Sequence, residues 1–162
     1  MTALATACLD PLFTACEAGR ALYAGAARTV GDPGLKLQFN HMATARADVL
    51  AEIAAVLGRE VVSMEQDVAA PVARWRVGGK VPLGGEVRPR ALAGDELCGL
   101  VRRLREHDEH LLLQMRQHVD TIPCLATVQV LERAIGVLSQ DLDKIRILEA
   151  LAAGQEGAPA TP

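Results

Sequence analysis

The chain has 162 residues, of which 50% are apolar and only 2% aromatic, so it has the length of one domain with an interior built mainly from Ala, Leu, Val and Ile. Its net charge of −3 excludes a strong electrostatic attraction to nucleic acid or anionic lipid. No uncharged stretch reaches the roughly 18 residues that a membrane span needs, and the N-terminus lacks the basic segment of a signal peptide. We therefore expect a cytoplasmic protein without a membrane partner.

The first helical pattern covers residues 6–30. Its apolar seam alternates steps of three and four residues, as the buried face of a bundle helix requires. Pro11 is best tolerated in a first helical turn, so a later start with Asp10 as the N-cap is an alternative. The predicted seam consists of Leu9, Leu12, Cys16, Gly19, Tyr23, Ala26 and Val30.

The Gly-Asp-Pro tripeptide at 31–33 ends this helix and starts the second one. Gly suits the position past a helix end, Asp an N-cap and Pro the first helical residue. The second helix is predicted over 33–57, with Gly58 ending it and Arg46 lying on its otherwise apolar stripe. Because the turn is so short, the first two helices should be antiparallel neighbours.

Residues 59–91 form a long connection rich in Gly and Pro, which excludes a long helix. A short helix can fit within 61–77 and would carry Trp75. We expect Trp75 to pack this crossover onto the bundle. The arginines around it suggest single-stranded nucleic acid, but a lone aromatic residue provides no stacking platform and acidic neighbours dilute the charge, so nucleic acid is not the expected partner.

The third helix is predicted over 95–119 and the fourth over 122–153. Pro123 marks the start of the fourth helix, with Asp120 or Thr121 as its cap. The tail at 154–162 has nothing to bury and should be disordered. Two short turns separated by one long connection predict an all-α fold, namely a ferritin-like antiparallel four-helix bundle with one long crossover between the second and third helices.

The segments Tyr23–Ala27, Asp32–Lys36 and Arg74–Trp75, in this order and spacing, resemble a bacterial family of ferritin-like four-helix-bundle proteins of unknown function. The resemblance extends from Leu9 to about Ala150 and implies the fold but no activity. The family often places an acidic residue about five positions before the tyrosine. This chain has Ala18 there, with Glu17 beside it.

A di-iron bundle needs a carboxylate from each of two helices and a Glu-x-x-His pair from each of the other two. The sequence contains no Glu-x-x-His, and the predicted fourth helix has no histidine. The second helix offers Gln38 and His41 instead, both away from its apolar stripe. We therefore expect no standard di-iron centre, and we expect His41 to form a structural hydrogen bond with Tyr23.

Asp108 is the chemical anomaly, because it occupies an apolar seam position in mid-helix. An isolated buried carboxylate is too costly, so Asp108 must pair, take up a proton or bind a cation. One interpretation pairs it with Arg133 or Arg46 and leaves the neighbouring histidines in water; an oligomer contact is another. The candidate metal site, for iron, manganese or zinc, consists of Asp108, Glu17, His107 and Glu132.

The sequence contains no nucleophile elbow, P-loop or dinucleotide-binding motif, so it carries no enzyme signature and no cofactor is expected. The leading hypothesis is a non-catalytic ferritin-like bundle that acts through protein–protein contacts, as a homo-oligomer or with a protein partner, in stress response by analogy with similar folds. The alternative is a metal-binding ferritin-like protein with a degenerate carboxylate and histidine site around Asp108.

Overall fold

A computed structural model describes residues 3–58 and 94–155. This part of the chain is all-α and consists of four helices, α1 (Ala3–Thr29), α2 (Pro33–Leu57), α3 (Gly94–Val119) and α4 (Leu125–Gln155). No strand occurs within it. The expected short helix around Trp75 and most of the expected disordered tail lie outside the described residues.

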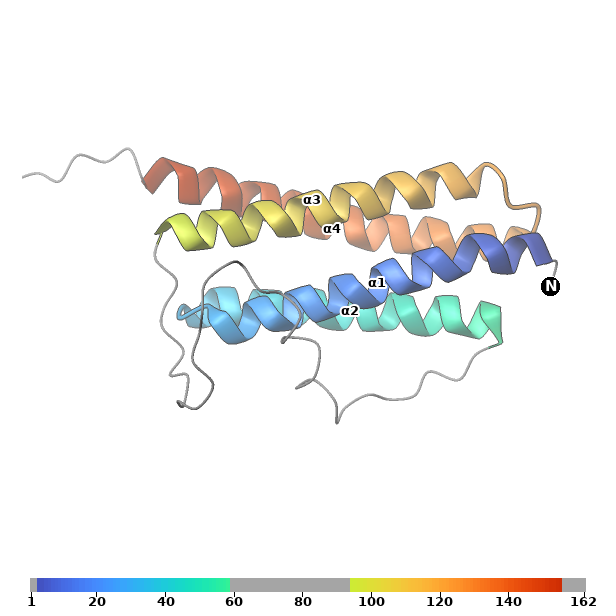
Figure 1. Cartoon of the computed structure of the whole chain (residues 1–162), viewed down its shortest axis with the longest axis horizontal. Coiled ribbons are helices and arrows are strands. Elements are labelled where there is room, and N and C mark those ends of the chain that lie inside the picture. Colours follow the sequence, from blue (N-terminus) through green and yellow to red (C-terminus); the bar gives the residue numbers. More distant parts are fainter. Residues whose placement is uncertain (1–2, 59–93, 156–162) are drawn as a thin grey trace, which may run out of the picture.

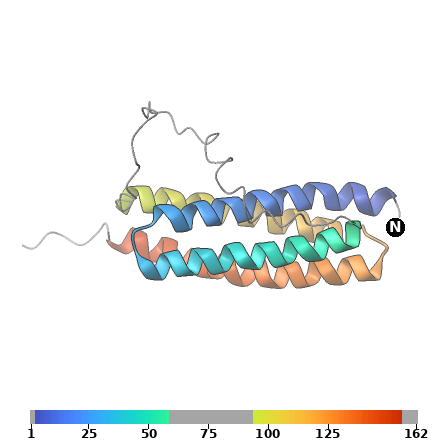
Figure 2. The ribbon, with the colours of Figure 1, turned by 90° about the horizontal axis from the view of Figure 1, so that it is seen from below.

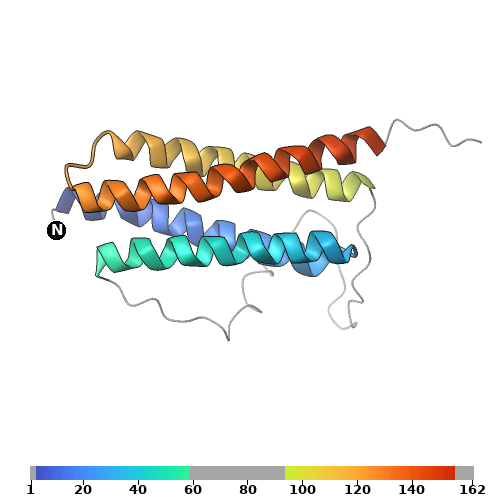
Figure 3. The ribbon, with the colours of Figure 1, turned by 180° about the vertical axis from the view of Figure 1, so that it is seen from behind.

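The four helices lie side by side along the length of the molecule (Figures 1 and 2). α1 packs mainly against α2, and α3 mainly against α4, so the chain forms two helical pairs. The pairs meet where α1 contacts α3 and α2 contacts α4. The turn between α1 and α2 lies at one end of the molecule, and the turn between α3 and α4 lies at the other (Figure 3).

α1 continues without a break through Pro11, so the alternative start with Asp10 as N-cap is wrong. A proline inside a helix removes one backbone hydrogen bond and costs about 3 kcal/mol. Here Leu9 and Leu12 are fully buried on either side of Pro11, and the burial of their side chains offsets that cost. All seven residues of the predicted seam are buried, including Val30, which directly follows the last residue of α1.

The predicted turn at 31–33 is confirmed in detail. Asp32 is the N-cap of α2, and its Oδ1 accepts a hydrogen bond from the Leu35 N–H at 2.7 Å. Pro33 occupies the first helical position. At the other end of α2, Gly58 has φ 67° and donates its N–H to the last carbonyls of the helix, a left-handed conformation that favours glycine.

The predicted start of α4 is wrong by three residues. The helix begins at Leu125, where the Cys124 carbonyl accepts the first helical bond from the Val128 N–H. The chain needs the intervening residues to turn, because Thr121 and Ile122 both donate their N–H groups back to the His118 carbonyl while the Ile122 side chain is buried in the core. Pro123 therefore lies in the connection and not in the helix.

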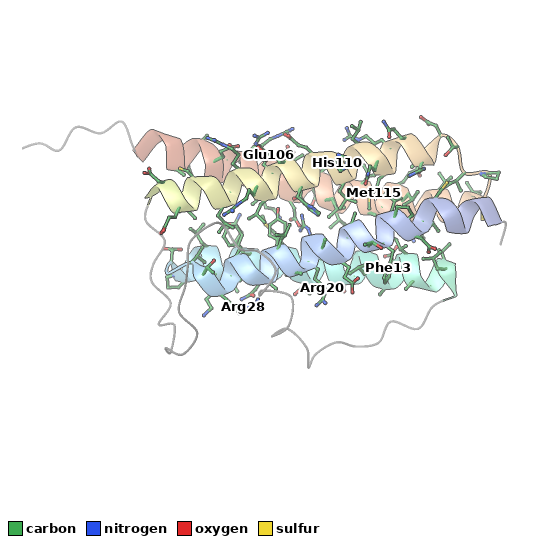
Figure 4. The ribbon with its side chains drawn as sticks, viewed as in Figure 1. Phe13, Arg20, Arg28, Glu106, His110 and Met115 are labelled. Carbon is green, nitrogen blue, oxygen red and sulfur yellow. The ribbon has the colours of Figure 1, made fainter. Side chains whose placement is uncertain are left out.

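Two apolar clusters fill the interior, one towards each end of the bundle. Figure 4 shows the side chains between the helices, with Met115 lying towards α1. The first cluster includes Leu12, Ile53, Met115, Leu131 and Leu138. The second includes Tyr23, Phe39, Leu104 and Ile145. Buried polar side chains from all four helices meet between the two clusters, and this level of the bundle is the candidate site.

Candidate functional site

Four polar side chains meet at the centre of the bundle, one from each helix. Tyr23 comes from α1, Arg46 from α2, Asp108 from α3 and Asp141 from α4. All four are almost completely buried, with exposed fractions of 0% for the first three and 2% for Asp141. We call this group the polar layer.

Arg46 is the hub of the polar layer. Its Nη2 donates to Asp108 Oδ2 at 2.6 Å, and its Nη1 donates to Asp141 Oδ2 at 3.0 Å. Nη1 also donates to the carbonyl of Met42, one turn earlier in α2, at 2.9 Å. One guanidinium therefore joins α2 to both helices of the other pair, with a planar set of donors that matches separate carboxylates.

Tyr23 completes the layer from α1. Its hydroxyl donates to Asp108 Oδ2 at 2.6 Å, and the guanidinium carbon of Arg46 lies 3.8 Å from the centre of its ring. A cation over the face of an aromatic ring is attracted by the ring quadrupole, and more so where water is excluded. The Tyr23 ring also contacts Phe39, and the two rings meet edge to face with their centroids 6.1 Å apart.

The layer is close to electrically neutral, which explains how four polar side chains are tolerated in the interior of the bundle. Arg46 is balanced by Asp108 and Asp141, and the second oxygen of Asp141 accepts from Lys144 Nζ at 3.1 Å at the edge of the bundle. Burial is the largest single influence on Arg46 and opposes its charge, but Asp108, Tyr23 and Asp141 together outweigh burial, so the pKa of the guanidinium is raised. Burial likewise raises the pKa of Tyr23 far above its ordinary value, which keeps it a neutral hydrogen-bond donor.

His107 borders the layer and lies against α1 at Gly19. A Cβ at Gly19 would come within 2.8 Å of His107 Nε2 and 3.4 Å of Arg46 Cδ, so this glycine lets the imidazole and the arginine stem approach the helix backbone closely. Burial lowers the pKa of His107, and the charge of Arg46 adds to that effect against the opposing pull of Asp108. Cys16, one turn away, is buried as well, and burial raises its pKa to about 12.

Three buried polar atoms of this region have no hydrogen-bond partner within residues 3–58 and 94–155. They are Arg46 Nε, Asp108 Oδ1 and His107 Nε2. Most buried polar atoms in proteins are paired, so these unpaired atoms of Arg46, Asp108 and His107 distinguish this region from an ordinary bundle core.

Of the two arginines predicted as partners of Asp108, only one pairs with it. Arg46 is its partner, whereas Arg133 donates through Nε and Nη2 to Glu52 on the surface, at 3.1 and 2.9 Å. Arg133 does not reach Asp108, because it lies on the outer side of α4 and faces Glu52 of α2. His110 is exposed as expected, but His107 is half-buried, so the prediction that both histidines face water holds only for His110.

The other residues predicted around Asp108 are not brought to it. Glu17 and Glu132 are exposed on the outer sides of α1 and α4. His41 is exposed too, so the expected hydrogen bond with Tyr23 is wrong, since Tyr23 points inward to Asp108 instead. Glu106 and His110 lie on the outward side of α3 (Figure 4).

Asp141 was not among the site residues predicted from the sequence, although the helical spacing of the fourth helix places it on the buried face. One apolar seam of the fourth helix runs from Leu138 through Leu142 to Ile145. Taking the step of three before the step of four leads from Leu138 to Asp141 and then to the same Ile145. All of these residues are buried, so a second seam containing a carboxylate ran beside the apolar one.

The residues of the polar layer do not fit a di-iron centre. Two carboxylates, a phenol and a guanidinium meet there, whereas such a centre uses four carboxylates and two histidines. No group of three or more His, Cys, Asp or Glu side chains in the described part of the chain is arranged to hold a metal ion. What the layer offers chemically is an enclosed site for one cation, and Arg46 occupies it.

Comparisons with protein-family models, curated proteins and solved structures found no match to this chain. Within the described residues, no helix combines the length and apolar character that crossing a membrane requires.

Proposed function

We propose that the chain is an antiparallel four-helix bundle with ferritin-like connectivity. Ion pairs support opposite directions for α3 and α4, because Arg105 reaches Glu149 at 2.7 Å while the later Glu109 reaches the earlier Arg146 at 3.0 Å. α2 ends and α3 begins at opposite ends of the molecule (Figures 1 and 3), which is the arrangement that one long crossover requires.

We further propose that this bundle is non-catalytic and acts through protein–protein contacts, first of all with a second copy of itself. This proposal is carried by two large apolar side chains that are exposed on the outward face of α4. Ile147 and Leu151 are each 61% exposed, and residues four apart lie on the same side of a helix. Exposed apolar groups of this kind favour association when they adjoin one another. The polar layer, by contrast, lies inside the bundle, where Arg46 pairs with both carboxylates.

Sedimentation velocity over a range of concentrations tests this function. We expect a dimer or larger assembly that dissociates on dilution, and a weaker association in the double variant Ile147→Glu/Leu151→Glu. Leu37→Glu is the matched control, because Leu37 is equally apolar and 72% exposed but lies on α2. A wild-type chain that stays monomeric at the highest concentration would contradict the proposal, as would equal effects of the α4 and α2 variants.

The metal-binding alternative remains a separate proposal with less geometric support. Asp108 is engaged by Arg46 and Tyr23, and two of its three predicted co-ligands, Glu17 and Glu132, are exposed elsewhere. Metal analysis of protein purified without chelator distinguishes the two functions. A stoichiometric transition metal that is lost on Asp108→Ala would favour the metal function over the contact function.

A further inference from the structure

We infer that the polar layer is a cation-binding site of guanidinium class, which the chain fills with its own Arg46. Without that side chain, the bundle would therefore bind a free guanidinium ion. This inference goes beyond the proposed self-association and does not depend on it.

The shape of the site matches a planar cation. Asp108 and Asp141 approach the guanidinium from two different helices, and each accepts from a different terminal nitrogen. The Tyr23 ring supplies a flat wall 3.8 Å from the guanidinium carbon. Two carboxylates in different directions and one aromatic face suit a planar, delocalised cation with several donors. They do not supply the number of ligands that a divalent metal ion takes from a protein site.

The site is also enclosed by the bundle. The Arg46 side chain is completely buried, and its two carboxylate partners have side-chain exposures of 0% and 3%. Truncating Arg46 to alanine thus leaves buried carboxylate charge without its cation, which is a strongly unfavourable state. It also leaves the volume of the guanidinium and its stem inside the bundle. A free guanidinium ion restores the charge and fills the part of this volume that lies between the two carboxylates and the Tyr23 ring.

The ion pairs of Arg46 connect the two helical pairs. Arg46 belongs to the α1–α2 pair, and its two carboxylates belong to the α3–α4 pair. The hydrogen bond from Tyr23 of α1 to Asp108 of α3 also connects the two pairs. The cation therefore holds the two pairs together at their centre, so that binding of a free cation in an Arg46→Ala chain should be visible as stability of the whole bundle.

The test is chemical rescue of Arg46→Ala by guanidinium chloride at millimolar concentrations, followed by thermal unfolding. We expect a saturable rise in Tm of roughly 5–10 °C. Sodium chloride, ammonium chloride and urea at the same concentrations should not reproduce the rise. Arg133→Ala is the matched control, because it too removes a guanidinium that donates twice to a carboxylate, but on the surface. Neither this control nor the wild type should respond.

Two outcomes would overturn the inference. One is the absence of a guanidinium-specific rise, or an equal rise in Arg133→Ala. The other is stabilisation of Arg46→Ala by manganese or zinc chloride that equals or exceeds the effect of guanidinium, which would make the layer a metal site that Arg46 blocks.

If Arg46→Ala does not fold in buffer, the same titration is read as recovery of helical circular dichroism. Failure to recover any helix counts against the inference. An independent measurement on the wild type uses nitrogen NMR of the arginine side chains. We expect one guanidinium with separate, exchange-protected Nη1 and Nη2 signals, which merge or disappear in Asp108→Asn. Averaged signals for every arginine would contradict a guanidinium held by two fixed carboxylates.

Discussion

Replacing Asp108 by alanine gives the most direct measure of how much the polar layer stabilises the fold. The substitution removes the acceptor of both Arg46 Nη2 and the Tyr23 hydroxyl, each at 2.6 Å, and leaves Arg46 with Asp141 as its remaining carboxylate. Breaking a fully buried ion pair by removing one partner costs about 3–5 kcal/mol, because the other charge stays buried. For a domain of this size, the loss corresponds to a drop in Tm of roughly 6–20 °C.

The assay is urea unfolding of the wild type and the variants, monitored by far-ultraviolet circular dichroism. Asp108→Asn is the informative companion, because it keeps the shape and an oxygen for Tyr23 but removes the charge, so its loss should be smaller than that of alanine. Glu52→Ala is the surface control. It removes the carboxylate partner of Arg133, and both side chains of that pair are about half exposed, so the expected loss is below about 1 kcal/mol.

A loss for Asp108→Ala no larger than that for Glu52→Ala would refute the reasoning. It would mean that Asp141 alone satisfies the buried guanidinium. A change in the denaturant dependence, rather than in the midpoint, would instead indicate that the variant unfolds in more than one step.

Three further predictions concern the surroundings of the layer and the start of α4. Gly19→Ala should destabilise the fold, because the new Cβ would meet His107 Nε2 at 2.8 Å; Gly136→Ala, where the space around the Cβ is open, should stabilise it by about 0.5–1 kcal/mol. Urea midpoints of the two variants check this contrast. Burial lowers the pKa of His107 from 6.5 in the folded protein. As the pH drops below 6.5, the imidazole is therefore protonated more readily in the unfolded chain, and the free energy of unfolding should fall. The fall should be smaller in His107→Gln, and an identical pH dependence would contradict the assignment. The Thr127 hydroxyl and the amides of the first turn of α4 lower the pKa of the exposed Cys124 thiol, so at neutral pH alkylation of this cysteine, followed by mass spectrometry, should be faster in the folded protein than in the denatured chain.

The candidate site could be predicted only in part. Asp108 was recognisable because a carboxylate in an apolar seam is unusual, and Arg46 because it lies on the stripe of the second helix. The choice between Arg46 and Arg133 depends on how far α2 and α4 are rotated and shifted against α3, and no periodicity within one helix contains that information. His41 is exposed, as its place away from the apolar stripe implies, so it does not form the predicted hydrogen bond with Tyr23. The Tyr23 hydroxyl points into the bundle and donates to Asp108 instead.

The sequence by itself determined the helices and their buried faces, because spacings of three and four apolar residues act within a single helix. It also determined the turn at Asp32 and the end at Gly58, which depend on the bonding of a few adjacent residues. The tertiary structure decided which polar side chains meet in the interior. That outcome depends on the joint burial of groups from four helices, where a guanidinium is tolerated only once Asp108 and Asp141 have both been brought to it.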